Sequence, residues 1–166
     1  MNARQMCAGV GLYVVTAVLA AATSTGPARF EARTSGAERL TLRGAAEFGP
    51  VMNGRGSGPF VLTLGPDSPT GAVVFTWPNG QRPEAGTYAL SDAGTGDVRA
   101  LVVTGSPTSP SGAYRARSGT VTVTRSSEDA VQGEFVLKAE GFRAWDLGDE
   151  DRPLEVRGSF SARRGR

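Results

Sequence analysis

The feature that most constrains the fold is an alternation of apolar and polar residues, repeated in short runs along most of the chain. From residue 39 onward, clusters of Gly, Pro, Ser and Asp separate these runs about every eight to fifteen residues. Period-two alternation is typical of a β-strand with one buried face, and Gly and Pro clusters mark turns. No segment in this part of the chain spaces its apolar residues as a helix would. The sequence therefore predicts an all-β domain.

The runs predict about eight antiparallel strands in a meander-like sandwich or closed barrel. Residues 98–104 are apolar on both faces, which predicts a central strand. Residues 105–112 have the composition of a loop. The alternation changes parity at Ser118-Gly119, as it would at a β-bulge. The side chains expected to face the core include Leu40, Leu42, Phe48, Phe60, Leu62, Leu64, Val73, Phe75, Trp77, Val131, Phe135, Leu137, Leu154, Val156 and Phe160.

One short pattern occurs at both ends of the predicted domain. The sequence LTLRG occupies residues 40–44, and LEVRG occupies residues 154–158. One interpretation is that both are arginine-rich edge strands. The other is that the first and last strands pair, which would close a barrel and remove its exposed edges.

The N-terminal segment has the three parts of a secretory signal peptide. Arg4 and the α-amino group provide positive charge, residues 6–22 form an apolar run, and Ala20-Ala21-Ala22 ends that run with small side chains. A membrane-spanning helix needs about 20 apolar residues, so a retained anchor is the alternative. The expected organisation is a signal peptide at 1–24, an extended segment at 25–38, a single β domain at 39–163 and a basic tail at 164–166. Such a protein would be periplasmic or extracellular.

The residues that the chain lacks exclude most enzyme chemistry. It contains no histidine, and Cys7, inside the predicted signal peptide, is its only cysteine. Nucleophilic sites built on Ser-His-Asp or Cys-His are therefore excluded, as are the usual zinc, copper and haem sites. The net charge of only +2 is spread along the chain, so no nucleic-acid partner is expected. We expect a protein that is not an enzyme and needs no cofactor.

Two groups of residues are candidate sites. Asp146, Asp149 and Asp151 lie in one acidic segment that could offer oxygen ligands to calcium, although a solvated hairpin loop explains the same charges. We expect at most a weak metal site there. The second group is aromatic, and its members could stack on a ligand if they reached one surface, or could instead pack in the core. It consists of Trp77, Tyr88, Tyr114 and Trp145.

Several short motifs in the second half of the chain occur in a recognisable order. They are GTYAL at residues 86–90, SGTVTVT at 118–124, VQGEF at 131–135 and GSF at 158–160. In these motifs the chain resembles a broad group of bacterial exported proteins and lipoproteins over about residues 84–163. The resemblance implies an antiparallel β fold and no established activity. The chain differs from the lipoproteins in lacking a cysteine after the signal segment.

Three functional hypotheses follow. The first is a non-catalytic binding domain that holds a small apolar or carbohydrate ligand at the barrel mouth and loops. The second is a structural or protein-interaction component of the cell envelope that docks a partner through an edge strand. The third, and least favoured, is a hydrolase that uses carboxylates alone. An apolar internal volume would favour the first, a long uncovered edge strand the second, and two facing carboxylates in a cleft the third.

Overall fold

A computed structural model describes residues 27–50, 58–92, 98–142 and 152–165, and this part of the chain is entirely β-structure and connections. The all-β prediction is confirmed, with ten strands where about eight were expected. No helix that could cross a membrane occurs in the described residues. The predicted signal peptide lies outside them. The strands are β1 (Arg29–Gly36), β2 (Thr41–Gly44), β3 (Ala46–Pro50), β4 (Phe60–Leu64), β5 (Gly71–Trp77), β6 (Gly86–Ala89), β7 (Arg99–Ser106), β8 (Ser109–Ser126), β9 (Ala130–Gly141) and β10 (Pro153–Arg164).

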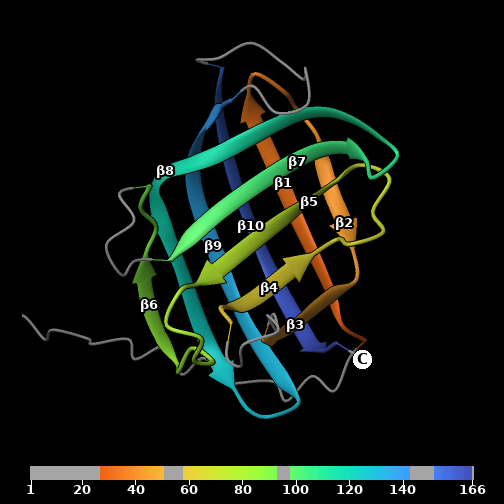
Figure 1. The fold of residues 1–166 in the computed structure, drawn as a ribbon. Helices are drawn as coiled ribbons and strands as arrows, with labels where there is room; N and C mark the ends of the chain where they lie inside the picture. Colours follow the sequence, from red (N-terminus) through yellow and green to blue (C-terminus); the bar gives the residue numbers. More distant parts are fainter. Residues whose placement is uncertain (1–26, 51–57, 93–97, 143–151, 166) are drawn as a thin grey trace, which may run out of the picture.

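The strands form one sheet that closes on itself (Figure 1). Pairing connects β10, β3, β4, β5, β7, β8 and β9 in turn and then returns to β10. The pairing of β3 with β10 is parallel, whereas the other pairings between named strands are antiparallel. Strands β1 and β2 extend from β10, and β6 pairs with β8. Both alternatives from the sequence are thus partly present, because the ring is closed but flattened.

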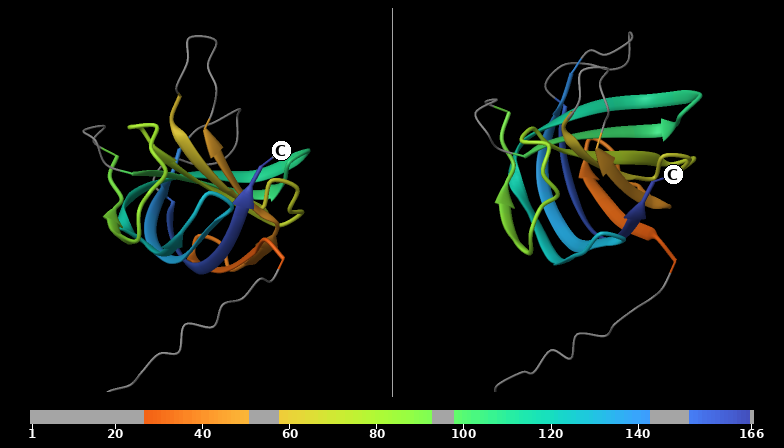
Figure 2. Two further views of the ribbon diagram at one scale, coloured as in Figure 1. Left: turned by 90° about the horizontal axis from the view of Figure 1, so that it is seen from below. Right: turned by 60° about the horizontal axis from the view of Figure 1, so that its bottom comes forward.

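The flattened ring has two layers (Figure 2). We call β3, β4, β5, β7 and residues 109–116 of β8 the front sheet. We call β2, β1, β10, β9, residues 118–126 of β8 and β6 the back sheet. Strand β8 belongs to both because it bends between its halves, so its long run joins the two layers.

The bend in β8 is the predicted β-bulge. The pairing of β8 with β9 shifts register between Ala116 and Ser118, next to Gly119. Gly119 has a φ of 134°, and a Cβ at this position would lie 2.2 Å from the carbonyl oxygen of Val136. Only glycine combines this backbone conformation with so close an approach. The glycine in the sequence therefore marks the corner between the sheets.

The closure of the ring differs from the one suggested by the paired LTLRG and LEVRG sequences. The segment expected to be extended, residues 25–38, contains β1, which pairs with β10 from Arg29↔Ser161 to Gly36↔Leu154. Strand β1 therefore lies between β2 and β10, and the two similar sequences do not pair. Closure is made by Arg163 and Arg164, which pair with β3, so Arg164 belongs to a strand and not to a free tail.

The loop expected at residues 105–112 is a tight hairpin. Strand β7 continues to Ser106 and β8 begins at Ser109, so only Pro107 and Thr108 connect them. Gly105, with a φ of 84°, accommodates a register shift in the ladder. Gly, Pro and Ser marked the chain reversal, but the polar residues around it still pair as strands.

Aromatic rings fill the space between the two sheets. Six of the seven phenylalanines are no more than 5% exposed, and Phe75 of the front sheet meets Phe135 of the back sheet at a centroid distance of 5.1 Å. The pockets found in the described part of the chain lie at outer faces and strand ends, where they open to solvent, and not between the sheets. The filled core gives no support to an internal ligand cavity. The buried phenylalanines are Phe30, Phe48, Phe60, Phe75, Phe135 and Phe160.

Candidate ligand-binding site

The structure does not bring the predicted aromatic residues together on a surface. Trp77 and Tyr114 are 3% and 1% exposed, so both are core residues and cannot stack on a ligand from solvent. Tyr88 is half-buried, with its ring 6.0 Å from that of Trp77 and its hydroxyl donating to the carbonyl of Glu84. Trp145 lies outside the described residues. Core packing, the alternative left open by the sequence, accounts for the first two.

The predicted acidic site falls in a part of the chain that the structure does not describe. Asp146, Asp149 and Asp151 all lie within residues 143–151, outside the described ranges. Within those ranges, no group of three or more Asp, Glu, His or Cys side chains is placed to hold a metal ion.

Tyr114 instead takes part in a polar network that connects the β1–β2 turn to the front sheet. Its hydroxyl donates to Oε1 of Glu38 at 2.6 Å, and the fully buried Thr104 donates to the same oxygen at 3.1 Å. Arg152 lies 3.9 Å from that oxygen. Burial, and then the hydrogen bond to Glu38, raise the pKa of Tyr114 to about 12. The network connects two parts of the fold and is not a surface binding site.

This pKa predicts a loss of stability at alkaline pH. The folded pKa of about 12 exceeds the unfolded value of about 10, so folding favours the neutral phenol. The resulting stabilisation is present in full below pH 10 and is lost as the pH rises through 12. Its loss should lower the free energy of unfolding by about 2 to 3 kcal/mol. Urea unfolding of wild type and Tyr114→Phe between pH 9 and pH 12 measures this, and equal declines in both proteins would contradict it.

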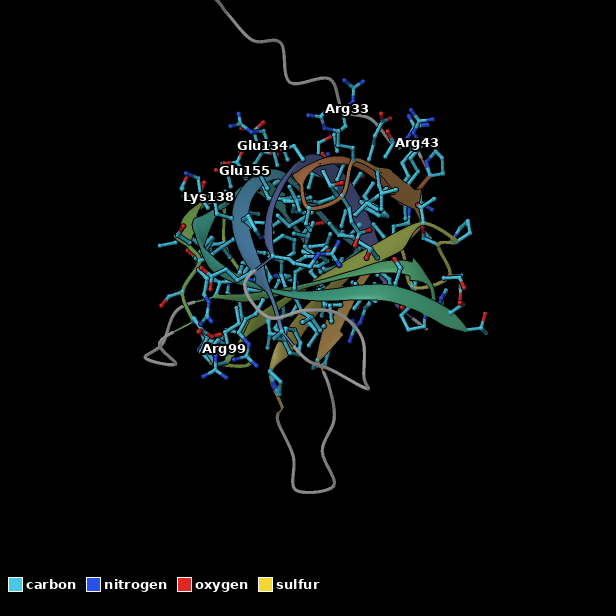
Figure 3. All side chains as sticks on the ribbon, turned by 90° about the horizontal axis from the view of Figure 1, so that it is seen from above. Arg33, Arg43, Arg99, Glu134, Lys138 and Glu155 are labelled. Atoms are coloured by element: carbon cyan, nitrogen blue, oxygen red, sulfur yellow. The ribbon has the colours of Figure 1, made fainter. Side chains whose placement is uncertain are left out.

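A pocket of about 360 Å³ lies on the outer face of the front sheet, where β5, β7 and β8 run side by side. We call it the arginine pocket. Because alternate residues of these strands face the core, Val74, Leu101 and Arg115 lie next to one another on the outer face. Arg99 lies on the same face of β7, opposite Thr76. Figure 3 shows Arg99 projecting from this side of the molecule. The pocket therefore combines an apolar floor, Val74 and Leu101, with two arginines and the carboxylate of Asp92.

The carboxylates around the arginine pocket pair more closely with Arg117 than with Arg115. Arg117 donates to Glu140 at 2.8 Å and also to Asp92. The hydrogen bond to Glu140, followed by the charge of Asp92, raises the pKa of Arg117 above its ordinary value. Arg115 lies 3.6 Å from the same Asp92 and 5.0 Å from the centre of the Phe142 ring. In the described part of the chain, Arg99 forms no ion pair within 4.0 Å.

These groups can bind an anion but are poorly suited to proton transfer. A guanidinium carries five N–H donors, has no acceptor and keeps its charge at neutral pH. Among the described residues, three arginines against two carboxylates leave a charge of +1 around the pocket, and Arg99 and Arg115 are the arginines that line it. The arrangement favours a ligand with an anionic group over Arg99 and Arg115 and an apolar part over Leu101.

Sequence reasoning did not identify this pocket, although a signal for it was present. Val74, Leu101 and Val103 are apolar residues on the outward parity of their strands, where polar residues are usual. For residues 98–104 this pattern correctly predicted a central strand, since β7 lies between β5 and β8. A meander makes β7 and β8 neighbours, but the register that places Arg115 beside Leu101 could not be read from the sequence, because it includes a shift at Gly105, inside the segment expected to be a loop.

Comparison of the chain with protein-family models, with curated proteins and with solved structures found no match.

Proposed function

We propose that this protein is an exported, non-catalytic domain that binds a small anionic ligand in the arginine pocket. The observation that carries the proposal is the half-buried apolar floor of Val74 and Leu101 beside the incompletely paired guanidiniums of Arg99 and Arg115. Hydrogen bonds to a charged group contribute about 1.5 to 3 kcal/mol each, so two arginines can hold one carboxylate or phosphate group. The predicted signal segment and the resemblance to exported bacterial proteins support export.

The outer face is a better candidate than the interior of the ring. Phenylalanine side chains occupy the interior, whereas the arginine pocket has a volume within the range of small-ligand sites. Docking through an edge strand has less support. The two strands at the ends of the pairing order, β2 and β6, have only four residues each, and short edges are one way in which proteins avoid strand addition.

A binding role is also favoured over hydrolysis by carboxylates. Asp92 lines the pocket, but Arg117 binds both Asp92 and Glu140. Both carboxylates thus face one guanidinium and do not face each other across a cleft as an acid–base pair would. The chain has no histidine to take that role.

The test uses hexanoate, which has one carboxylate and a short apolar tail, and hexanol as its neutral counterpart. Isothermal titration calorimetry should show hexanoate binding with a Kd of about 0.1 to 1 mM, as expected for a ligand of this size. Hexanol should bind at least about tenfold more weakly, because it cannot pair with Arg99 and Arg115.

Two variants complete the experiment. Arg99→Gln should weaken hexanoate binding about tenfold or more, since it removes a lining arginine that forms no ion pair with the described residues. Arg125→Gln replaces another exposed arginine, on the back-sheet half of β8, and should leave the affinity unchanged. Equal binding of hexanoate and hexanol, or equal losses in the two variants, would exclude the arginine pocket as the site.

A further inference from the structure

The outer face of the back sheet contains two like charges directly opposite each other. Arg33 of β1 is paired in register with Arg157 of β10, and both side chains point away from the core. Next in the same row, Val136 of β9 is paired with Arg157. Figure 3 shows Arg33 on this face, on the other side of the molecule from Arg99. The row is therefore separate from the arginine pocket.

Folding alone does not explain this pair. Like charges directly opposite on adjacent strands are destabilising. The adjacent carboxylates are engaged elsewhere, because Glu31 pairs with Arg43 at 3.0 Å and Glu155 lies 3.9 Å from Lys138. Among the described residues, neither Arg33 nor Arg157 has a carboxylate within 4.0 Å. A bound anion would compensate both charges.

The surroundings of Arg157 include space and an apolar contact. A pocket of about 220 Å³ beside it is lined by Thr120, Thr122, Glu134 and Val136. Val136 is 41% exposed, more than any other large hydrophobic residue in the described part of the chain. The hydroxyl of Thr120 adds a donor, that of Thr122 is hydrogen-bonded with Thr87 at 3.1 Å, and Glu134 is the one acidic lining residue. An anion bound at Arg157 could thus place an attached apolar group on Val136.

The charge of the two arginines favours a tetrahedral anion. Arg115 in the arginine pocket lies near Asp92, but Arg33 and Arg157 have no such carboxylate in the described part of the chain, so the single charge of a carboxylate ligand would balance only one of them. A phosphate monoester offers three terminal oxygens and a charge of about −1.5 to −2 at neutral pH, enough for two guanidiniums. On this face Glu31, Glu134 and Glu155 are interspersed with basic side chains such as Arg43 and Lys138, so its charge is mixed and it is not the continuous basic surface that a flat anionic membrane would attract. The face therefore fits a soluble ester better than a lipid headgroup.

We propose that Arg33 and Arg157 form a second binding site, for the phosphate group of a soluble phosphate monoester whose organic part contacts Val136. The proposal does not depend on the arginine pocket. It makes two predictions that a purely structural role for Arg157 would not, one for binding and one for stability without ligand.

The binding experiment uses hexyl phosphate as the probe and follows the backbone amide signals of Val136 and Arg157 by NMR. It is done in the Arg99→Gln protein, in which ligand binding at the arginine pocket is impaired. The signals should shift saturably with hexyl phosphate and several-fold less with hexanoate. Arg157→Gln should weaken binding about tenfold. Glu134→Gln should strengthen it several-fold, because it removes the carboxylate beside the site. The Arg125→Gln change should have no effect.

The stability experiment measures the melting temperature without ligand. Arg157→Gln should raise it by roughly one to four degrees, since the change removes the repulsion with Arg33. A fall of several degrees would mean that Arg157 stabilises the fold, and it would overturn the proposal. The proposal would also be overturned if hexyl phosphate did not shift the Val136 signal, or if hexanoate shifted it equally. The same holds if the shift persisted in Arg157→Gln. If the protein sedimented with vesicles containing phosphatidic acid but its amide signals did not respond to hexyl phosphate, the site would bind a membrane lipid and the proposal of a soluble ester would be wrong.

Discussion

Replacing Gly119 with alanine should lower the free energy of unfolding by about 2 to 4 kcal/mol, because an L side chain fits neither the backbone nor the space at this position. The residue has a φ of 134°, and the new Cβ would meet the carbonyl oxygen of Val136 at 2.2 Å. That carbonyl belongs to the backbone of β9, which cannot move without disturbing the ladder between β8 and β9. Chemical denaturation followed by circular dichroism measures the effect.

Gly86→Ala provides the matched control. Gly86 also lies in a strand, β6, but a Cβ there would have no heavy atom within 4 Å, and its φ is not positive. Its replacement should leave stability within about 1 kcal/mol of wild type, with a gain possible through the reduced entropy of the unfolded chain. Similar losses in the two variants would mean that the bend at Gly119 does not determine how the sheets are joined.

Phe135→Ala should destabilise the domain by about 3 to 5 kcal/mol, the range for deletion of a large aromatic side chain from a core. Phe135 is 2% exposed, and its ring lies 5.1 Å from that of Phe75 and 6.5 Å from that of Phe160. Gly158 allows this packing, because a Cβ at that position would lie 2.9 Å from Cζ of Phe135. Alanine at 135 would leave a cavity between the layers that rigid strands cannot close.

The neighbouring residue supplies the comparison. Val136 lies on the opposite face of the same strand and is 41% exposed, so Val136→Thr should change stability by no more than about 0.5 kcal/mol. Both variants can be measured by urea unfolding at neutral pH. A loss below about 1 kcal/mol for Phe135→Ala would mean that the two layers do not share the aromatic core described above.

The fold was predictable from the sequence to the extent that it depends on local pattern. Alternation assigned Phe75, Phe135 and Phe160 to the core, and all three are buried. The parity change at Gly119 located the bulge, because a one-residue shift moves side chains to the other face. Strand β1 was missed even though Phe30, Ala32 and Thr34 alternate with exposed residues. Small and polar residues at two of the three buried positions made that pattern weak.

Pairing between distant strands was much harder to predict. The parallel contact of Arg163 and Arg164 with β3 closes the ring, yet nothing in either segment specifies the other. The candidate site depends on the same kind of information. Val74 lies beside Leu101 because β5 pairs with β7 and not with β6, the next strand along the chain, and Asp92 approaches Arg115 from the segment between β6 and β7. The sequence suggested Trp77 and Tyr114 as ligand-binding residues because large aromatic rings can stack on a ligand. The same large apolar rings are buried in the core.

Mapping of hexanoate binding by NMR tests most directly whether the ligand site lies on the outer face of the front sheet. Titration of the isotopically labelled protein should shift the amide signals of Arg99, Leu101 and Arg115 together, along one saturation curve. Amides of β9 in the back sheet, such as that of Leu137, should not follow that curve, because the aromatic core separates them from the pocket. Saturable shifts centred on Phe135 and Leu137, with none at Arg99 and Arg115, would show that the ligand enters between the sheets and would contradict the assignment of the arginine pocket.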